Sequence, residues 1–309
     1  MSNLFQRLNN AANEANVDKQ AAQKMFYLEH LMKQVSQSKY KDDFIVKGGF
    51  ELASVWGWEN RMTQDLDTTL NNHTLDEKVT AQIFEKVFRD ANDEVAFTVR
   101  QAKPIMEGND YPGLRFMFDV EYREAHDVVR LDVSTGDLIL PAPRMLHHES
   151  VLRDGTGFDM WGYPLEQILA DKEVATLQRT DTRFRAKDVL DIVHLSTFNS
   201  KNIDTEKAAT AFQRTAKHKH LDIATEKEVR QHLADLGSSL LVLDRWARFQ
   251  MAHPYAAGTS IETALKAVYS TYEVIGKEPQ RSLSEAIDHA KAAQLPNRTR
   301  SRSRDERER

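Results

Sequence analysis

The chain has 309 residues, of which 40% are apolar and 29% are charged, and it contains no cysteine. This length suits one elaborate domain or two ordinary ones, and the lack of cysteine excludes disulfides, cysteine–zinc sites, iron–sulfur clusters and thiol catalysis. The net charge of −5 excludes a uniformly basic nucleic-acid binder, so affinity for phosphate must come from a local patch.

The two ends of the chain carry different signals. Residues 1–19 lack the basic and apolar regions of a signal peptide, and the longest apolar runs are too short to span a bilayer. We therefore expect a cytoplasmic protein with no membrane partner. Residues 296–309 carry six arginines and three acids, a net charge of +3 that leaves −8 on the other 295 residues. This Arg-rich tail is expected to be disordered, either as an arm that contacts RNA or as a solvated terminus.

Predicted helices and strands alternate in the first half of the chain. Apolar residues at spacings of three and four predict helices within residues 1–40, and again over 50–58 and 75–91. Short apolar or alternating runs predict strands over 44–46, 65–70, 95–99, 114–122 and 128–134. The polar stretch 123–127 predicts a hairpin between the last two of these strands.

The second half of the chain is helical by pattern. Helical periodicity covers residues 165–179, 187–197, 206–215, 225–249, 260–275 and 283–293. Glycines and a proline between residues 155 and 164 mark the change of character. The expected parts are N-terminal helices over 1–40, an α/β unit over 41–150, a helical domain over 151–295 and the tail over 296–309.

A glycine pair and two aspartates are the first candidates for chemistry. Lys47-Gly48-Gly49 joins a predicted strand to a helix, where backbone N–H groups can bind an anion at the helix N-terminus. Asp65 and Asp67 share one side of a predicted strand. Two adjacent carboxylates repel unless a cation neutralises them, and Mg²⁺ takes one or two carboxylates together with substrate phosphates. An ordinary strand–helix turn and a surface strand are the alternatives.

A third aspartate lies in the apolar run 128–133. Arg130 and Asp132 share one face of this predicted strand, and the other face is apolar. Such an acid fits if its strand lies beside the strand that carries Asp65 and Asp67. Three carboxylates on two adjacent strands, facing the glycine pair, then form a metal-dependent phosphoryl-transfer site. Alternatively, this face is solvated and Arg130 pairs with Asp132.

The helical half offers charged residues on two helix faces. One face carries Lys172, Thr176 and Arg179. A lysine at this place can bind nucleotide phosphates as a point charge. On the next helix, Asp188 and Asp191 share a face. The alternative is a solvated helix in which Lys187 pairs with Asp191, a pair worth only ~0.3–0.5 kcal/mol.

The segment around the glycine pair resembles a known family signature. KGGFELASVWGWENRMTQDLDTTL is similar to the signature of the AbiEii/AbiGii nucleotidyltransferase-like toxins, in which Lys-Gly-Gly precedes a helix and Arg-x-Ser/Thr-x-Asp-Ile/Leu-Asp follows. The matching residues are Lys47, Gly48, Gly49, Arg61, Thr63, Asp65, Leu66 and Asp67. Later elements follow in the family's order: RLDVSTGD with Asp132, ILADKEVATLQR with Lys172, and RAKDVLDI with Lys187, Asp188 and Asp191. The resemblance covers residues 44–195 and departs at Phe50, where the family usually has a small residue, often threonine or serine.

This resemblance implies a fold and an activity. The expected fold class is α+β, with a polymerase-β-like nucleotidyltransferase core of mixed sheet and flanking helices, followed by a helical C-terminal domain. The implied protein is the toxin of a bacterial toxin–antitoxin or abortive-infection system, a form of phage defence, with a separately encoded antitoxin as partner. The implied reaction transfers nucleotides from a nucleoside triphosphate (NTP) to RNA, in first place to the 3′ end of tRNA, and blocks translation.

The resemblance also implies roles for individual residues. The implied Mg²⁺ ligands are Asp65, Asp67 and Asp132. The implied NTP-binding residues are Lys47, Gly48, Gly49, Arg61, Thr63 and Lys172. Asp132 can instead help to activate the attacking hydroxyl. Asp188 or Asp191 binds the nucleotide or supports Lys172, and both are candidates for the catalytic residue.

Two alternatives to an RNA substrate remain open. The acceptor can be a protein hydroxyl, or the chain can be a nucleotide- or partner-binding module without turnover. The histidines of segments 147–148 and 218–220 are expected to be solvated rather than metal ligands. Trp56 and Trp58 are expected to pack in the core rather than stack on a base.

Overall fold

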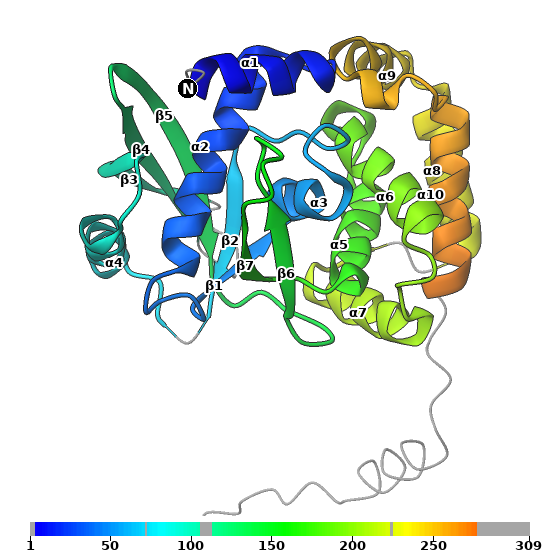
Figure 1. Cartoon of the computed structure of the whole chain (residues 1–309). Coiled ribbons are helices and arrows are strands. Elements are labelled where there is room, and N and C mark those ends of the chain that lie inside the picture. The colour runs from blue at the N-terminus through cyan, green and yellow to red at the C-terminus, as the bar shows by residue number, and fades with distance from the viewer. Residues whose placement is uncertain (1–3, 72, 106–112, 223–224, 277–309) are drawn as a thin grey trace, which may run out of the picture. The chain divides into compact units, whose positions relative to one another are not determined.

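The computed structural model describes residues 4–71, 73–105, 113–222 and 225–276. Two predictions, the helix over 283–293 and the Arg-rich tail, lie outside these residues. Within them, seven strands form one mixed sheet (Figure 1). In chain order the strands are β1 (Phe44–Lys47), β2 (Leu66–Leu70), β3 (Ala96–Ile105), β4 (Gly113–Tyr122), β5 (Ala125–Ser134), β6 (Arg144–Glu149) and β7 (Gly157–Gly162). Across the sheet their order is β3-β4-β5-β2-β1-β7-β6.

The register of the central strands aligns charged residues from distant parts of the sequence. β1 runs antiparallel to β2 and pairs Lys47 with Asp67. β2 runs parallel to β5 and pairs Asp67 with Asp132, so the expectation that these two strands are neighbours is confirmed. β4 runs antiparallel to β5 and places Arg115 opposite Asp132. The four charged residues therefore form one row across β1, β2, β5 and β4.

Helices accompany the sheet and make up the second half of the described chain (Figure 1). The helices of the sheet half are α1 (Leu4–Glu14), α2 (Lys19–Ser36), α3 (Gly48–Trp56) and α4 (Glu77–Asp90). Those of the helical half are α5 (Leu165–Gln178), α6 (Ala186–Phe198), α7 (Thr205–His218), α8 (Glu226–Ser238), α9 (Leu240–Ala252) and α10 (Ile261–Ile275). Two short 3₁₀ turns, η1 (Asp181–Arg183) and η2 (Pro254–Ala256), precede α6 and α10. The α+β class is thereby confirmed.

Two elements differ from the sequence prediction. The single helix predicted over 225–249 is divided into α8 and α9, because Ser239 between them has an extended backbone with ψ of 121°. Glycine and serine are weak helix formers, and the run from Gly237 to Ser239 interrupts the helix although apolar periodicity continues on both sides. β6 and β7 were not expected. In β6 the buried positions are Leu146 and His148, so the alternation becomes visible only when a histidine is counted as a core residue.

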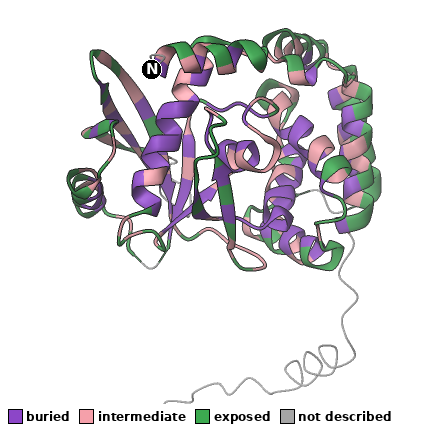
Figure 2. Ribbon diagram, in the orientation of Figure 1, coloured by how far each residue is buried: buried purple, intermediate pink, exposed green. Residues whose placement is uncertain are grey.

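The apolar side chains form two cores that meet at the start of α3. The first core packs α1, α2 and α4 against the sheet, and the second joins the helices of the second half. Figure 2 shows buried residues concentrated on α2, the central strands and α5. Ile45 of β1 and Leu52 of α3 belong to the second core, together with Ile168 and Leu169 of α5. This packing brings residues of both halves to the same place.

One further property concerns membranes. Among the helices of the described residues, none has the length and apolar character needed to cross a bilayer.

Candidate active site

The start of α3 lies directly against β2. Gly48, the first residue of α3, has a φ of +73°, a conformation that favours glycine. A Cβ atom on Gly48 would lie 2.8 Å from Oδ2 of Asp67, and one on Gly49 would lie 2.8 Å from Oγ1 of Thr63. A larger residue at either position would push the helix away from the aspartate strand. The N-terminus of α3, where free backbone N–H groups can bind an anion, therefore lies beside the carboxylate of Asp67.

The carboxylates of Asp65 and Asp67 lie in a repulsive environment. Burial raises the pKa of Asp67 to about 6, and the negative charges of Asp65 and Asp132 add to this shift. Oγ1 of Thr63 donates to Oδ1 of Asp65 at 3.0 Å, which orients that side chain. A divalent cation removes the repulsion, and Mg²⁺ needs only one or two carboxylates when phosphates supply further ligands. Asp65 and Asp67 therefore fit such an ion.

Asp132 is held by an arginine that the sequence analysis did not single out. Nε and Nη2 of Arg115 donate to Oδ1 and Oδ2 of Asp132, each at 2.7 Å. The partner of Asp132 is thus Arg115 of the neighbouring strand, whereas Arg130 is exposed. Among the described residues, no group of three carboxylate or imidazole side chains is close enough to hold a metal ion. In this arrangement Asp65 and Asp67 remain available to a cation, while Arg115 neutralises Asp132.

The charged residues of the helical half form a paired network. Nε and Nη2 of Arg61 donate to Oδ1 and Oδ2 of Asp191 at 2.7 and 3.0 Å. Nζ of Lys172 lies 2.6 Å from Oδ1 of Asp188 and 2.9 Å from Oδ2 of Asp191. Arg179 contacts the second carboxylate oxygen of Asp188. Burial alone would raise the pKa of Asp191, but Arg61 and Lys172 hold it below its ordinary value.

This network shows where several predicted residues lie. Arg61 and Asp191 are 5% and 1% exposed, so Arg61 faces Asp191 rather than a ligand. The alternative pair of Lys187 with Asp191 on a solvated helix is wrong, because buried Asp191 pairs with Arg61 and Lys172. Thr176 is buried, and its hydroxyl has no hydrogen-bond partner among the described residues. Of the three residues predicted on one helix face, Lys172 and Arg179 therefore belong to the charged network, and Thr176 does not.

A cleft of about 210 Å³ joins the glycine pair to this network. Its lining residues are Lys47, Gly48, Asp67, Tyr163, Ile168, Asp171, Lys172, Ala175, Arg179, Arg185, Asp188 and Lys219. Five of these side chains are basic and three are acidic. An excess of positive charge beside a helix N-terminus suits a ligand with several negative charges. Lys47, Gly48, Asp67, Lys172 and Asp188, all named from the sequence, meet in this one place.

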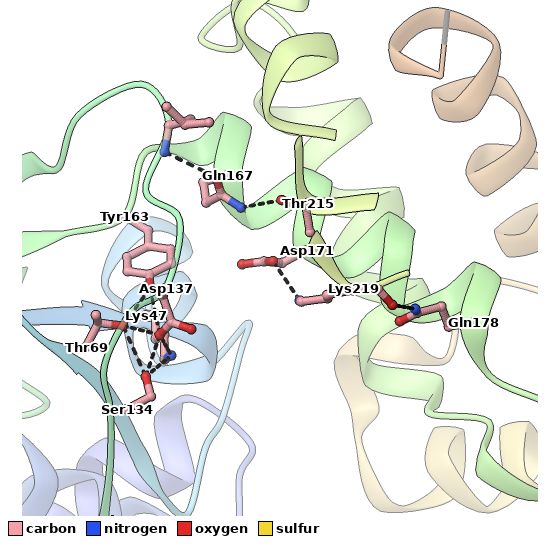
Figure 3. Close-up of polar contacts among 11 residues, drawn as sticks. Lys47, Thr69, Ser134, Asp137, Tyr163, Gln167, Asp171, Gln178, Thr215 and Lys219 are labelled. Carbon is pink, nitrogen blue, oxygen red and sulfur yellow. Dashed lines mark hydrogen bonds and ion pairs between the residues drawn. The ribbon is translucent and has the colours of Figure 1, made fainter. Parts of the chain in front are cut away.

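Asp137 is a polar centre that the sequence analysis missed. Its carboxylate contacts Nζ of Lys47 and the hydroxyl of Ser134, and it accepts from Oγ1 of Thr69 at 2.5 Å and from the hydroxyl of Tyr163 at 3.2 Å (Figure 3). Although burial opposes ionisation, these partners lower the pKa of Asp137 to about 2, with the charge of Lys47 as the largest of them. Lys47 is thereby fixed in the wall of the cleft. Asp137 closes the segment RLDVSTGD, where an acid after a Ser-Thr-Gly turn was the available signal.

A second pair in the wall of the cleft was also missed. Nζ of Lys219 lies 2.9 Å from Oδ1 of Asp171, across from the Asp137 centre in Figure 3. Asp171 directly precedes the predicted Lys172, but its partner comes from a distant helix end that no local pattern connects to α5.

The weaker candidates for chemistry have structural roles. The ring of Phe50 stacks on His148 with centroids 4.8 Å apart, so this position offers no hydroxyl to a phosphate. Nδ1 of His147 lies 2.7 Å from exposed Asp159, whereas His148 is buried, contrary to the expectation of a solvated histidine. Nε1 of Trp56 donates to Oδ1 of Asn199 at 2.6 Å, and Trp58 is buried. The expectation that the tryptophans pack against the protein is confirmed.

Comparisons with known proteins place the chain in a family. The family model described as "Nucleotidyl transferase AbiEii toxin, Type IV TA system" matches residues 30–267. Two solved structures from Helicobacter pylori are similar, each with 16% sequence identity and a TM-score of 0.47. One, a candidate nucleotidyltransferase, aligns over 85% of this chain and 98% of its own; the other, JHP933, aligns over 90% and 99%. A search of the curated proteins gave no match. The chain therefore belongs to the AbiEii family of nucleotidyltransferase toxins of type IV toxin–antitoxin systems.

Proposed function

We propose that the chain uses Mg²⁺ to transfer nucleotides from an NTP to RNA, in first place to the 3′ end of tRNA, and thereby blocks translation. The observation that carries this proposal is the close approach of Gly48 to Asp67 at a basic cleft. It joins an anion-binding helix N-terminus to a carboxylate pair that fits a divalent cation. Membership of a type IV toxin–antitoxin family also implies a separately encoded antitoxin as partner.

The cleft is the proposed site of the triphosphate. Gly48 lines the cleft, so its backbone can approach phosphate oxygens closely, whereas Gly49 is buried against Thr63 and lets α3 begin close to that residue. Lys172 and Arg179 supply positive charge from α5, and their contacts with Asp188 hold both in place. Catalysis of phosphoryl transfer consists largely of such positioning and charge neutralisation.

The carboxylates of β2 and β5 are the proposed reaction centre. Asp65 and Asp67 would hold Mg²⁺, which neutralises negative charge on the phosphates when bound. The acceptor hydroxyl attacks the α-phosphorus, its proton passes to a nearby base, and the bond to the leaving pyrophosphate breaks. Asp132, the register partner of Asp67, is the proposed base or a further metal ligand. In either role it must exchange part of its contact with Arg115 for the substrate or the ion.

The two acids of α6 receive different proposed roles. Asp188 lines the cleft and contacts Lys172 and Arg179, so it is the better candidate for contact with the nucleotide. Asp191 is almost fully buried between Arg61 and Lys172, so it acts as a positioning residue.

Label transfer tests the proposal. Purified protein is incubated with Mg²⁺, total bacterial RNA and each α-labelled NTP in turn. We expect a labelled band of tRNA size, and a loss of about 10²–10³-fold in Asp65→Asn and Asp67→Asn, because each removes a carboxylate charge from the reaction centre. Asp90→Asn is the matched control, since Asp90 is 64% exposed on α4 and pairs with its neighbour Arg89.

The outcomes separate the possible acceptors. Label that ribonuclease removes and protease leaves supports RNA as the substrate. Label that protease removes and ribonuclease leaves identifies a protein hydroxyl as the acceptor and contradicts the proposal. NTP binding without any labelled product would indicate a binding module.

A further inference from the structure

A second and larger cavity lies near the catalytic segment, apart from the triphosphate cleft. Its volume is about 650 Å³, and it is bounded by the α1–α2 junction, residues 59–64, the start of α6 and residues 251–255. The segment that leads into β2 contributes Met62 and Gln64, the latter directly before Asp65. None of the functions proposed above uses this cavity.

The cavity and the cleft share a wall. On α6, Lys187 lines the cavity and the adjacent Asp188 lines the cleft. On the segment leading into β2, Gln64 lines the cavity and Asp67 lines the cleft. The buried pair of Arg61 with Asp191 belongs to the same two segments. Two ligand-sized spaces therefore adjoin the N-terminal end of the carboxylate strand, one reached by Gln64 and the other by Asp67.

Lys187 is the charged group of the cavity that lacks a partner. It is partly buried, and within the described residues it forms no ion pair and no hydrogen bond. Burial and the charge of Arg61 lower its pKa, and the more distant charges of Asp65 and Asp191 offset this only in part. The acids of the lining contact other groups: Asp18 caps α2, and Oε1 of Glu59 pairs with Arg153, while Oε2 of Glu59 has no hydrogen-bond partner among the described residues. An anionic ligand would neutralise and stabilise a partly buried ammonium at this position.

The other side chains that line the cavity are of the kinds that bind a nucleoside. The hydroxyl of Tyr255 is buried without a hydrogen-bond partner among the described residues, and the ring of His253 lies 5.3 Å from that of Tyr255. Asn60 and Gln64 also line the cavity with amide groups, of which Nδ2 of Asn60 donates to the carbonyl oxygen of Trp56 at 2.8 Å. Aromatic rings stack on bases, and amides bind base edges, which is how single-stranded RNA is recognised.

The position of the cavity favours the acceptor over the donor. In phosphoryl transfer the attacking and leaving oxygens lie roughly in line on opposite sides of the phosphorus. With the triphosphate in the cleft beside Gly48, the attacking hydroxyl must arrive from elsewhere along the carboxylate strand. The cleft has five basic side chains for a polyanion, whereas the cavity has Lys187, which matches the single charge of a phosphodiester.

We propose that this cavity is the acceptor subsite, which receives the 3′-terminal nucleotide of the RNA with its phosphodiester at Lys187 and its base among the aromatic and amide side chains. This inference rests on the proposed function, because it assigns the second substrate of the same reaction.

RNA binding without turnover tests the subsite. The probe is a short single-stranded RNA with a 5′ fluorophore and a free 3′ hydroxyl, titrated by fluorescence anisotropy at several salt concentrations. We expect Lys187→Met to weaken RNA binding by about tenfold and to reduce the slope of log affinity against log salt by about 0.7, the value for one lost phosphate contact. Tyr255→Leu removes an aromatic ring from the lining and should weaken RNA binding by about tenfold, as expected for one lost base stack. Binding of a fluorescent NTP should change by less than about twofold in both variants.

Controls keep this test specific. Lys266→Met removes the same charge from an exposed position on α10 and should leave both affinities and the salt slope unchanged. Thermal unfolding of Lys187→Met should occur at the wild-type temperature or above it, because the substitution removes an ammonium that burial disfavours.

Each outcome decides one point. Unchanged RNA binding in Lys187→Met overturns the subsite, and so does weaker NTP binding with unchanged RNA binding, which would assign the cavity to the donor base. If wild-type protein transfers label to RNA in either case, the proposed function stands. If RNA binding depends on Lys187 but no label is transferred, the cavity is an RNA site and the proposed function fails.

Discussion

The two sides of the cleft differ in how they treat their buried carboxylates, apart from Asp137, which Lys47 keeps ionised on the β2 side. On the side of α3 and β2, burial raises the pKa of Glu51 to about 8 and that of Asp67 to about 6. On α6, burial acts in the same direction on Asp188 and Asp191, but adjacent basic side chains outweigh it and hold both pKa values below the ordinary range. The α6 wall is thus electrostatically complete within the protein, whereas the β2 wall has an excess of negative charge.

This difference assigns distinct tasks to the two walls. In a network where every buried charge has a partner, the side chains are held in fixed positions. Loss of one partner leaves the other charge buried and unneutralised, which strongly destabilises the fold. Lys47 and Lys172 offset only part of the unfavourable environment of Asp67, and a cation from solution can remove the rest. We therefore expect the α6 wall to position side chains and the β2 wall to bind the metal ion and the substrate.

The largest expected effect is a loss of stability when the ion network of the α6 wall is broken. Asp191→Asn leaves Arg61 and Lys172 without their shared buried partner, so we expect the free energy of unfolding to fall by about 3–5 kcal/mol in urea denaturation. The control Asp171→Asn breaks a partly exposed pair with Lys219 and should cost no more than about 1 kcal/mol. Equal losses in the two variants would contradict the contrast between the walls.

The buried Glu51 predicts a dependence of stability on pH. Its folded-state pKa of about 8 lies above the ordinary value of 4.5, so its protonated form stabilises the fold fully below pH 4.5. This stability is lost as the pH rises to about 8. We expect Glu51→Gln to gain about 2 kcal/mol over wild type above pH 8 and nothing below pH 4.5. Urea denaturation across this range measures the difference, and a constant offset would show that Glu51 stays ionised.

The close approach of α3 to β2 can be tested at one glycine. Gly48→Ala adds a Cβ 2.8 Å from Oδ2 of Asp67 at a positive φ, so we expect a stability loss of about 1–2 kcal/mol together with weaker NTP binding. Gly155→Ala is the matched control, since Gly155 also has a positive φ of +77° but no atom within 4 Å. It should lose about 1 kcal/mol of stability and keep NTP binding. Unchanged NTP binding in Gly48→Ala would argue against a phosphate at the start of α3.

The smallest expected effect is a gain in stability. Asp67→Asn removes one of the repelling charges, so the metal-free variant should be more stable than wild type by about 1 kcal/mol. Thermal unfolding with and without Mg²⁺ provides the comparison, because the ion should stabilise wild type and leave the variant nearly unchanged. A variant that loses stability without Mg²⁺ would show that the β2 wall is already neutralised.

The candidate site was predictable where its residues lie close together in the sequence. The glycine pair, Asp65 and Asp67 fall within one short segment whose spacing specifies a strand, a turn and a helix. Asp132 was placed beside Asp67 by an argument about burial, and the register of β2 with β5 confirms that placement. The partners of these residues were harder to predict, because Arg115 carries no local pattern that points to the site and Asp137 had only its place after a Ser-Thr-Gly turn as a signal.

By itself, the sequence determined the α+β class, the family resemblance and the residues that carry the candidate chemistry, because periodicity and motif spacing are local properties. Only the tertiary structure decided which charges pair. Arg61 meets Asp191 across 130 residues of sequence, and Lys47 meets Asp137 across 90. The second cavity is likewise assembled from four separate segments. Such partners are selected when strands and helices pack and desolvate their side chains together, and the energy of a buried pair depends on that environment rather than on the identity of its members.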